Sequence, residues 1–336
     1  MDNSREAKLK RAHNKLVNAS VSATKTCYFL KCRNKTINAH SISNKRLLLK
    51  LSDNGYVMYF DKDASLMGTL QETGRNKATV FNGFCGDHDK IFHPIDNEDY
   101  VEGAVGQEYL FAMRASAKEY TTRAALSHAM AKRIEETAPE LSEFPLDVDG
   151  LELYRAFQHS FDVGLKDQSI TRGIFIDTFI KSKYNVLSTT LLVVDEELPI
   201  AVSSSFNMEL SYDGTVINDL SNDESALETR MKHCFLNIFP QNGKTYCLIS
   251  YLKRDRKDYD FLQSMNGFDE SLKKVIISNL LTSYTENFTA NPTYWRSLSA
   301  DTLKIYFAVY ANSFKAQYAP FIANHELNLF PSAQVS

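Results

Sequence analysis

The sequence predicts an α+β fold with a small module at the N-terminal end, a helical middle, and a C-terminal antiparallel sheet with helices. Three observations predict it. Closely spaced cysteine and histidine pairs lie within residues 24–95, helix-forming residues without proline fill residues 106–138, and apolar runs separated by turn sequences occupy residues 188–252. Ligand pairs of this kind stabilise small modules, whereas the other two patterns are typical of long helices and of strands.

The composition indicates an ordinary folded protein. The chain has 336 residues, of which 43% are hydrophobic and 24% charged, and this balance excludes a disordered or fibrous protein. No run of 18 apolar residues occurs, and the polar N-terminus lacks the apolar segment of a secretory signal. The five cysteines are an odd number, which favours a reducing compartment over a disulfide framework. We therefore expect a cytoplasmic protein without a membrane segment.

The charge is distributed unevenly along the chain. Residues 1–50 contain eight lysines and four arginines against two acidic residues, a net charge of +10, so the remainder carries −13 to reach the overall −3. A basic segment of this kind suggests an anionic partner such as nucleic acid, with Lys8, Lys10, Arg11 and Lys15 as the candidate phosphate contacts. A solvated basic helix is the alternative. The acidic body could bind a protein partner.

Four segments follow in order. Residues 1–23 form a basic, weakly amphipathic helix, and residues 24–100 form the small module. Inside the module, Asn54-Gly55 is either a hairpin turn or the end of a helix over residues 44–52 that precedes the strand YVMYF.

The rest of the chain is divided by a change from helical to strand periodicity. Residues 101–185 are helical, with one long helix or a broken pair before Pro139 and a second helix from about residue 150. Residues 186–322 form an α+β region with at least four largely antiparallel strands, a hairpin around Gln241-Asn242-Gly243-Lys244, and helices after it. The last two segments could form one domain.

The residues with the most informative chemistry are Cys27, Cys32, Cys85 and His88. They form two short-spaced pairs, and two such pairs on two turns are the usual way in which a chain supplies the four tetrahedral ligands of zinc. A module of about 70 residues has little core of its own, so a structural Zn²⁺ would stabilise it directly. A reduced cysteine cluster without metal is the alternative.

The order of the cysteine pair, then His40 in the apolar-strand context Ala39-His40-Ser41-Ile42, then Asn82 shortly before the second pair, resembles an HNH-type domain, which has a ββα-metal, treble-clef zinc fold. The resemblance covers only residues 24–95. It implies that His40 is the general base, that Asn82 orients it, and that Asp89 or His93 holds a catalytic Mg²⁺ or Mn²⁺. Two departures from the family are Ala39, where an acidic residue or histidine often precedes the base, and the long insertion between His40 and Cys85. His40 could instead be structural, or a zinc ligand.

Two functions of different classes follow. The first is a nucleic-acid-directed protein that could act as a metal-dependent nuclease. The build of the chain is similar to that of bacterial defence or mobile-element effectors. The second is a non-enzymatic protein-interaction module shaped by zinc. Ala39 favours the second function, because the acidic residue that often precedes the base is absent there. The basic segment favours a nucleic-acid partner under either function.

Overall fold

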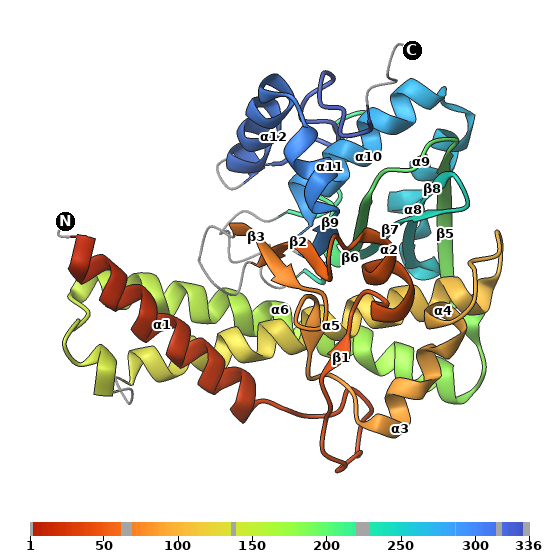
Figure 1. Ribbon diagram of the computed structural model, residues 1–336. Coiled ribbons are helices and arrows are strands. Elements are labelled where there is room, and N and C mark those ends of the chain that lie inside the picture. Colours follow the sequence, from red (N-terminus) through yellow and green to blue (C-terminus); the bar gives the residue numbers. More distant parts are fainter. Residues whose placement is uncertain are drawn as a thin grey trace.

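A seven-stranded antiparallel sheet separates two groups of helices in the computed structural model (Figure 1). The structure describes residues 3–61, 69–135, 139–219, 229–285, 287–313 and 318–331, and every element named below belongs to them. The strands lie in the order β3-β2-β9-β6-β7-β8-β5. Their bounds are Tyr56–Asp61 (β2), Thr69–Gly74 (β3), Leu187–Val194 (β5), Ile200–Asn207 (β6), His233–Gln241 (β7), Lys244–Leu252 (β8) and Phe288–Ala290 (β9). The predicted α+β class, with a C-terminal antiparallel sheet, is confirmed.

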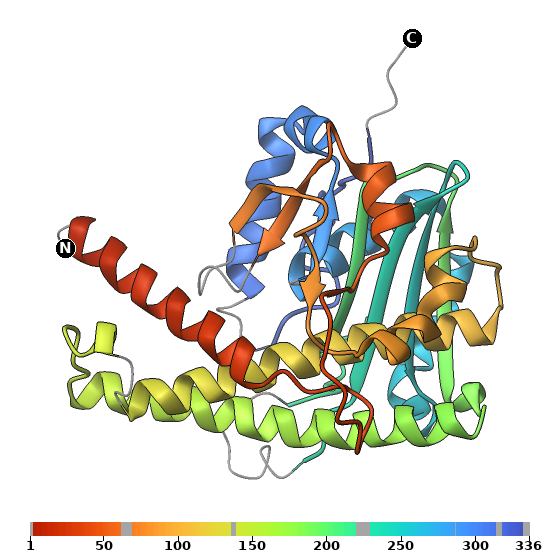
Figure 2. The same ribbon diagram turned by 60° about the horizontal axis from the view of Figure 1, so that its bottom comes forward.

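Two long helices, α5 (Val105–Ile134) and α6 (Val148–Ile180), cover one face of the sheet (Figure 2). Phe111 and Phe175 from these helices pack against Phe235 and Phe239 of β7. Helix α1 (Asn3–Ala23) lies across the far ends of this pair and packs through a small apolar cluster. Each predicted helical stretch of the middle region is therefore a single long helix.

The C-terminal helices cover the opposite face of the sheet (Figure 1). They are α8 (Arg256–Tyr259), α9 (Phe261–Ser264), α10 (Glu270–Tyr284), α11 (Pro292–Ser297) and α12 (Ala300–Ser313). Buried side chains of α10, α11 and α12 fill a second core against the sheet. No described helix combines the length and apolarity that crossing a bilayer requires.

Local chemistry explains several element boundaries. The carboxylates of Asp147 and Asp269 accept hydrogen bonds from the backbone N–H groups of Gly150 and Leu272, and thereby cap α6 and α10. Asn242 and Gly243 have φ values of 52° and 81° between the paired residues Gln241 and Lys244. A two-residue turn with both φ values positive matches the twist of a hairpin, so the predicted β7–β8 hairpin is confirmed.

The N-terminal part contains a ββα arrangement. Strands β1 (Ala39–His40) and β4 (Val80–Phe81) pair antiparallel, and helices α3 (Gly86–Asp89) and α4 (His93–Asp96) follow them. Between the two strands, a helical turn at Asn44–Leu48 continues into α2 (Leu49–Leu51), and Asn54-Gly55 then turns the chain into β2. The helical reading of residues 44–52 is therefore confirmed.

The inserted strands β2 and β3 join the large sheet. Met58 and Tyr59 of β2 pair with Ala290 and Thr289 of β9. The apolar side chains around the N-terminal cysteines also belong to the same core as α5, α6 and β7. The division of the chain into four domains stays a prediction, but the core is continuous across the boundary predicted near residue 100.

Candidate metal centre

Two turns bring the predicted ligands together. Cys27 and Cys32 flank a tight loop before β1, in which Lys31 has a φ of 64°. Cys85 immediately precedes α3, and His88 lies within that helix. The backbone N–H of Tyr28 donates to the carbonyl oxygen of Gly83 at 2.6 Å, which holds the loop against the second ligand pair. Gly83 is needed at this approach, because a Cβ there would lie 2.5 Å from the ring of Phe81.

The four ligand atoms have the spacing of a tetrahedral site. All four lie within 4.8 Å of one another. His88 Nδ1 is 3.3 Å from the sulfurs of Cys27 and Cys85, and the sulfurs of Cys32 and Cys85 are 3.9 Å apart. Zinc–ligand bond lengths of about 2.3 Å to sulfur and about 2.0 Å to nitrogen imply separations of roughly 3.5–3.8 Å. This Cys₃His cluster could therefore hold a metal ion such as zinc, and it is the one such group that the described residues contain.

The protonation preferences of the ligands differ. Burial raises the pKa of Cys27 to about 11. Burial would also raise the pKa of Cys85, but the backbone N–H groups of His88 and Asp87 favour its thiolate, and its pKa is lowered. Burial lowers the pKa of His88 and keeps the imidazole neutral. Thiolate and neutral imidazole are the forms that bind a metal. Cys85 and His88 therefore reach their metal-binding protonation states more readily than Cys27 does.

Neighbouring side chains hold the ligand loop in place. The ring of Phe29 stacks on His88 with the two centroids 4.0 Å apart. From α6, Arg172 donates to the backbone oxygens of Tyr28 (2.5 Å) and Cys27 (3.0 Å), and its guanidinium lies over the rings of Tyr28 and Tyr120. The sequence contains no signal for this arginine, because its partner is the backbone of a loop 144 positions away.

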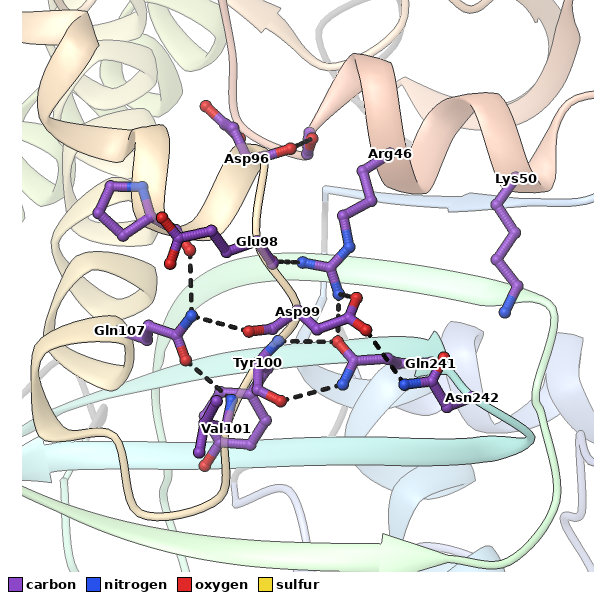
Figure 3. Close-up of polar contacts among 12 residues, drawn as sticks. Arg46, Lys50, Asp96, Glu98, Asp99, Tyr100, Val101, Gln107, Gln241 and Asn242 are labelled. Atoms are coloured by element: carbon purple, nitrogen blue, oxygen red, sulfur yellow. Dashed lines mark hydrogen bonds and ion pairs between the residues drawn. The ribbon is translucent and has the colours of Figure 1, made fainter.

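The chain that follows the ligand helices is fastened to the large sheet (Figure 3). Gln241, at the end of β7, accepts a hydrogen bond from the N–H of Tyr100 (2.8 Å) and donates to its carbonyl oxygen (3.0 Å). Arg46 donates to the same Gln241 oxygen and to the backbone oxygen of Glu98. The segment between α4 and α5 is therefore attached to the sheet through polar contacts, and the residues around the cluster share a core with the sheet.

His40 lies at the end of β1, outside the metal cluster. Its Nδ1 is 3.0 Å from the carbonyl oxygen of Ala78, which can only accept, so Nδ1 carries the proton. The amide nitrogen of Asn44 lies 3.4 Å from Nε2. Burial lowers the pKa of His40, as do the charges of Arg114 and Arg75, whereas the Ala78 carbonyl and Asp96 raise it. The neutral form with a lone pair on Nε2 is the favoured state.

The other residues that the resemblance implies are dispersed. Asn82 lines a small cavity of about 50 Å³ beside α1 and α5, and the amide that contacts His40 belongs to Asn44. Asp89 is half-buried, and its pKa is raised by burial and by the charge of Asp96. His93 is exposed, one helical turn after Asp89. Asn44 lies four positions after His40, at the start of a helical stretch, but this spacing alone does not show that it faces the ring.

The predicted phosphate contacts lie on α1. Lys8, Lys10, Arg11 and Lys15 are all exposed, and Lys15 forms an ion pair with Glu140. The buried side of the helix, with Leu16 and Val17, packs against α5. Lys8, Lys10 and Arg11 are therefore exposed to solvent, whereas Lys15 is held in its ion pair with Glu140.

The chain matches no family model, no curated protein and no solved structure.

Proposed function

We propose that the chain is a nucleic-acid-directed protein in which a structural zinc ion, bound by Cys27, Cys32, Cys85 and His88, shapes an HNH-like module. The observation that carries the proposal is the order of the parts. A loop with two ligands, a strand pair with His40 at the end of its first strand, and a helix with the last ligands at its start occur in the order that the resemblance implies.

The charge around the metal centre supports a polyanionic partner. Lys31, Arg33 and Lys35 lie on or directly after the ligand loop, and all three are exposed. Helix α1, with its exposed cations, leads directly into this loop. Neutralising several phosphates with such cations is the main source of non-specific affinity for nucleic acid.

We extend the proposal to cleavage, with His40 as the general base. The bond from Nδ1–H to the Ala78 carbonyl fixes the ring and leaves Nε2 able to take a proton from water. A water molecule would have to replace the amide of Asn44 at Nε2.

A catalytic Mg²⁺ or Mn²⁺ fits these residues poorly. Asp89, at the end of α3, and His93, at the start of α4, are the two candidate donors, because the nearby Asp96 is bound to Arg114 at 2.6 Å. Two donors do not complete a divalent-ion site.

A plasmid-nicking assay with added Mg²⁺ or Mn²⁺ tests the enzymatic part. The His40→Ala variant should lose nicking while it keeps its zinc content and its fold. The matched control is His325→Ala, which removes an exposed histidine elsewhere and should keep full activity. Nicking that persists in purified His40→Ala protein would exclude His40 as the base.

The second candidate is a non-enzymatic, zinc-stabilised protein-interaction module. Three observations favour it: Asn44 occupies Nε2 of His40, Asn82 lines a separate cavity, and Arg114 neutralises Asp96. Under this alternative, the acidic body binds a protein partner and nicking is absent from the wild-type protein at any concentration of divalent ion.

A further inference from the structure

A cavity of about 520 Å³ lies where the sheet opens between β2 and β6. It is lined by residues of α5 and α6 from one face and of α10 and α12 from the other, the two helix layers that Figure 1 shows on opposite sides of the sheet. Sites for small ligands commonly have volumes of about 300–1,000 Å³, so the cavity is large enough for a metabolite.

The opening follows from the short length of β9. Among the described residues, β9 pairs with β6 only from Ile200 to Val202, and its last backbone contact is from the Ser203 N–H to the Asn287 carbonyl. Ser204, Ser205 and Asn207, which come later in β6, pair only with β7 on the other side. All three contribute to the cavity wall.

Five buried polar side-chain atoms of residues in the cavity wall are without partners in the described part of the chain, Arg123 Nε and Asn207 Oδ1 among them. The other three are Ser203 Oγ, Ser204 Oγ and Asn287 Oδ1, and these residues are only 3%, 7% and 5% exposed. The amide of Asn287 is fixed, because its nitrogen donates to the Ser203 carbonyl (2.7 Å) and to Ser41 Oγ (2.8 Å). Its oxygen is therefore the acceptor that remains. Buried polar groups without partners are costly, and a polar ligand would supply the missing bonds.

Cationic groups from α5 line the same cavity. Lys118 and Arg123 are both part of its wall, together with Glu119, which accepts a bond from Arg123 Nη2 at 3.0 Å. Arg123 Nε is a buried donor without a partner in the described structure. Gly164 of α6 allows the guanidinium to lie there, since a Cβ at that position would be 2.6 Å from Arg123 Nη1. The lining carries one net positive charge.

Aromatic rings complete the wall. Tyr59, Phe206, Tyr284 and Tyr310 all line the cavity, and Phe206 stacks on Tyr284 with centroids 4.6 Å apart. The lining thus offers cationic donors for an anionic oxygen, hydroxyl groups that both donate and accept, one fixed amide acceptor, and flat apolar surfaces.

We propose that this cavity binds a phosphorylated sugar, either free or as part of a mononucleotide. The phosphate would lie against Lys118 and Arg123, and a sugar hydroxyl would donate to Asn287 Oδ1. The serine hydroxyls of β6 would bond the remaining sugar oxygens. This site is separate from the metal centre and does not depend on the function proposed for it.

Isothermal titration and thermal unfolding of the full-length protein test the proposal, with inorganic phosphate, ribose 5-phosphate, AMP and adenosine as probes. We expect ribose 5-phosphate or AMP to bind at about one per chain and to raise the melting temperature, with adenosine binding at least about tenfold more weakly. Preference for ribose 5-phosphate or for AMP distinguishes the free sugar from the nucleotide. No binding of either compound at millimolar concentration, or equal binding of adenosine, would overturn the proposal.

Two variants locate the binding. Arg123→Gln should weaken the binding of the phosphorylated probe by at least about tenfold. Ser204→Ala, which removes only one hydroxyl, should weaken its binding by about tenfold or less. The matched control is Lys132→Gln, which removes a cation from the same helix outside the cavity wall. Unchanged affinity in Ser204→Ala and in folded Arg123→Gln would place the ligand elsewhere and reject the site.

Discussion

Gln241 offers the sharpest test of how the segment between α4 and α5 is attached to the sheet. It is 5% exposed, and its side chain satisfies both backbone groups of the equally buried Tyr100. Replacing it with methionine keeps the length and most of the volume but removes the donor and the acceptor. The Tyr100 N–H and carbonyl oxygen would then be buried without partners.

The expected cost can be worked from these contacts. A buried polar group that loses its partner costs about 1–3 kcal/mol, so two such groups should lower the free energy of unfolding by about 2–6 kcal/mol. Loss of the bond from Arg46 adds less, because Arg46 keeps its bond to Glu98 and its ion pair with Asp99.

Urea unfolding followed by the fluorescence of Trp295, which is 7% exposed between Phe288 and Tyr306, measures this change. The matched control is Asn242→Gly, which removes an exposed bond to Asp99 from the next residue while it permits the φ of 52°. The control should change stability by less than about 0.5 kcal/mol. If Gln241→Met lowers the free energy of unfolding by no more than the control does, the hydrogen bonds of Gln241 contribute nothing to stability.

Three further predictions concern the metal centre and the basic helix. Elemental analysis of the purified protein should find about one zinc per chain. The Cys85→Ser variant should lose the zinc and have a lower free energy of unfolding. The control variant Cys247→Ser, which changes a buried thiol outside the cluster, should keep its zinc. Arg172→Gln should speed transfer of zinc to a chelator, since the ligand loop loses two bonds to its backbone; an unchanged rate would contradict this. Binding to nucleic acid should weaken steeply as the salt concentration rises. Replacing Lys8, Lys10 and Arg11 with glutamate should abolish this binding in a filter-binding assay. Unchanged binding would mean that these charges serve solubility only.

Local chemistry made the larger part of the fold predictable. The β7–β8 hairpin follows from two adjacent residues, Asn242 and Gly243, whose preference for positive φ acts without any distant partner. The long helices follow in the same way from propensity over 30 and 33 residues. The Cys₃His cluster, which could hold a metal, could be predicted because each pair is formed within a few residues, and only the meeting of the two pairs required the fold.

Non-local contacts explain what the sequence did not predict. Strand β2 joins the large sheet through pairing of Met58 with Ala290, and no property of either segment specifies a partner more than 200 positions away. The partner of His40 is Asn44 because the strand ends and a helical turn begins there, and a motif spacing cannot show which asparagine faces the ring. The cavity arises from the shortness of β9, which depends on pairing and not on composition.

His233 gives a last prediction, on the acid sensitivity of the fold. It begins β7 and is 4% exposed. Burial lowers its pKa to about 3, and the nearby charges of Arg123, Arg230 and Arg254 act in the same direction. The folded state therefore keeps this imidazole neutral, whereas in the unfolded chain it takes a proton below its ordinary pKa of about 6.5.

The unfolded state thus binds more protons between about pH 6.5 and pH 3, and stability must fall as the pH falls through this window. Proton linkage gives a loss of about 2 kcal/mol from pH 7 to pH 5 for this one group. His13, His40 and His88, whose pKa values burial also lowers, add to the slope of the wild-type protein. Urea unfolding of wild-type and His233→Gln protein at both pH values isolates the contribution of His233, because the variant keeps the other three histidines. The loss between pH 7 and pH 5 should be smaller in the variant by about 2 kcal/mol, whatever its absolute stability. Equal losses in the two proteins would mean that His233 takes its proton in the folded state as readily as in the unfolded one.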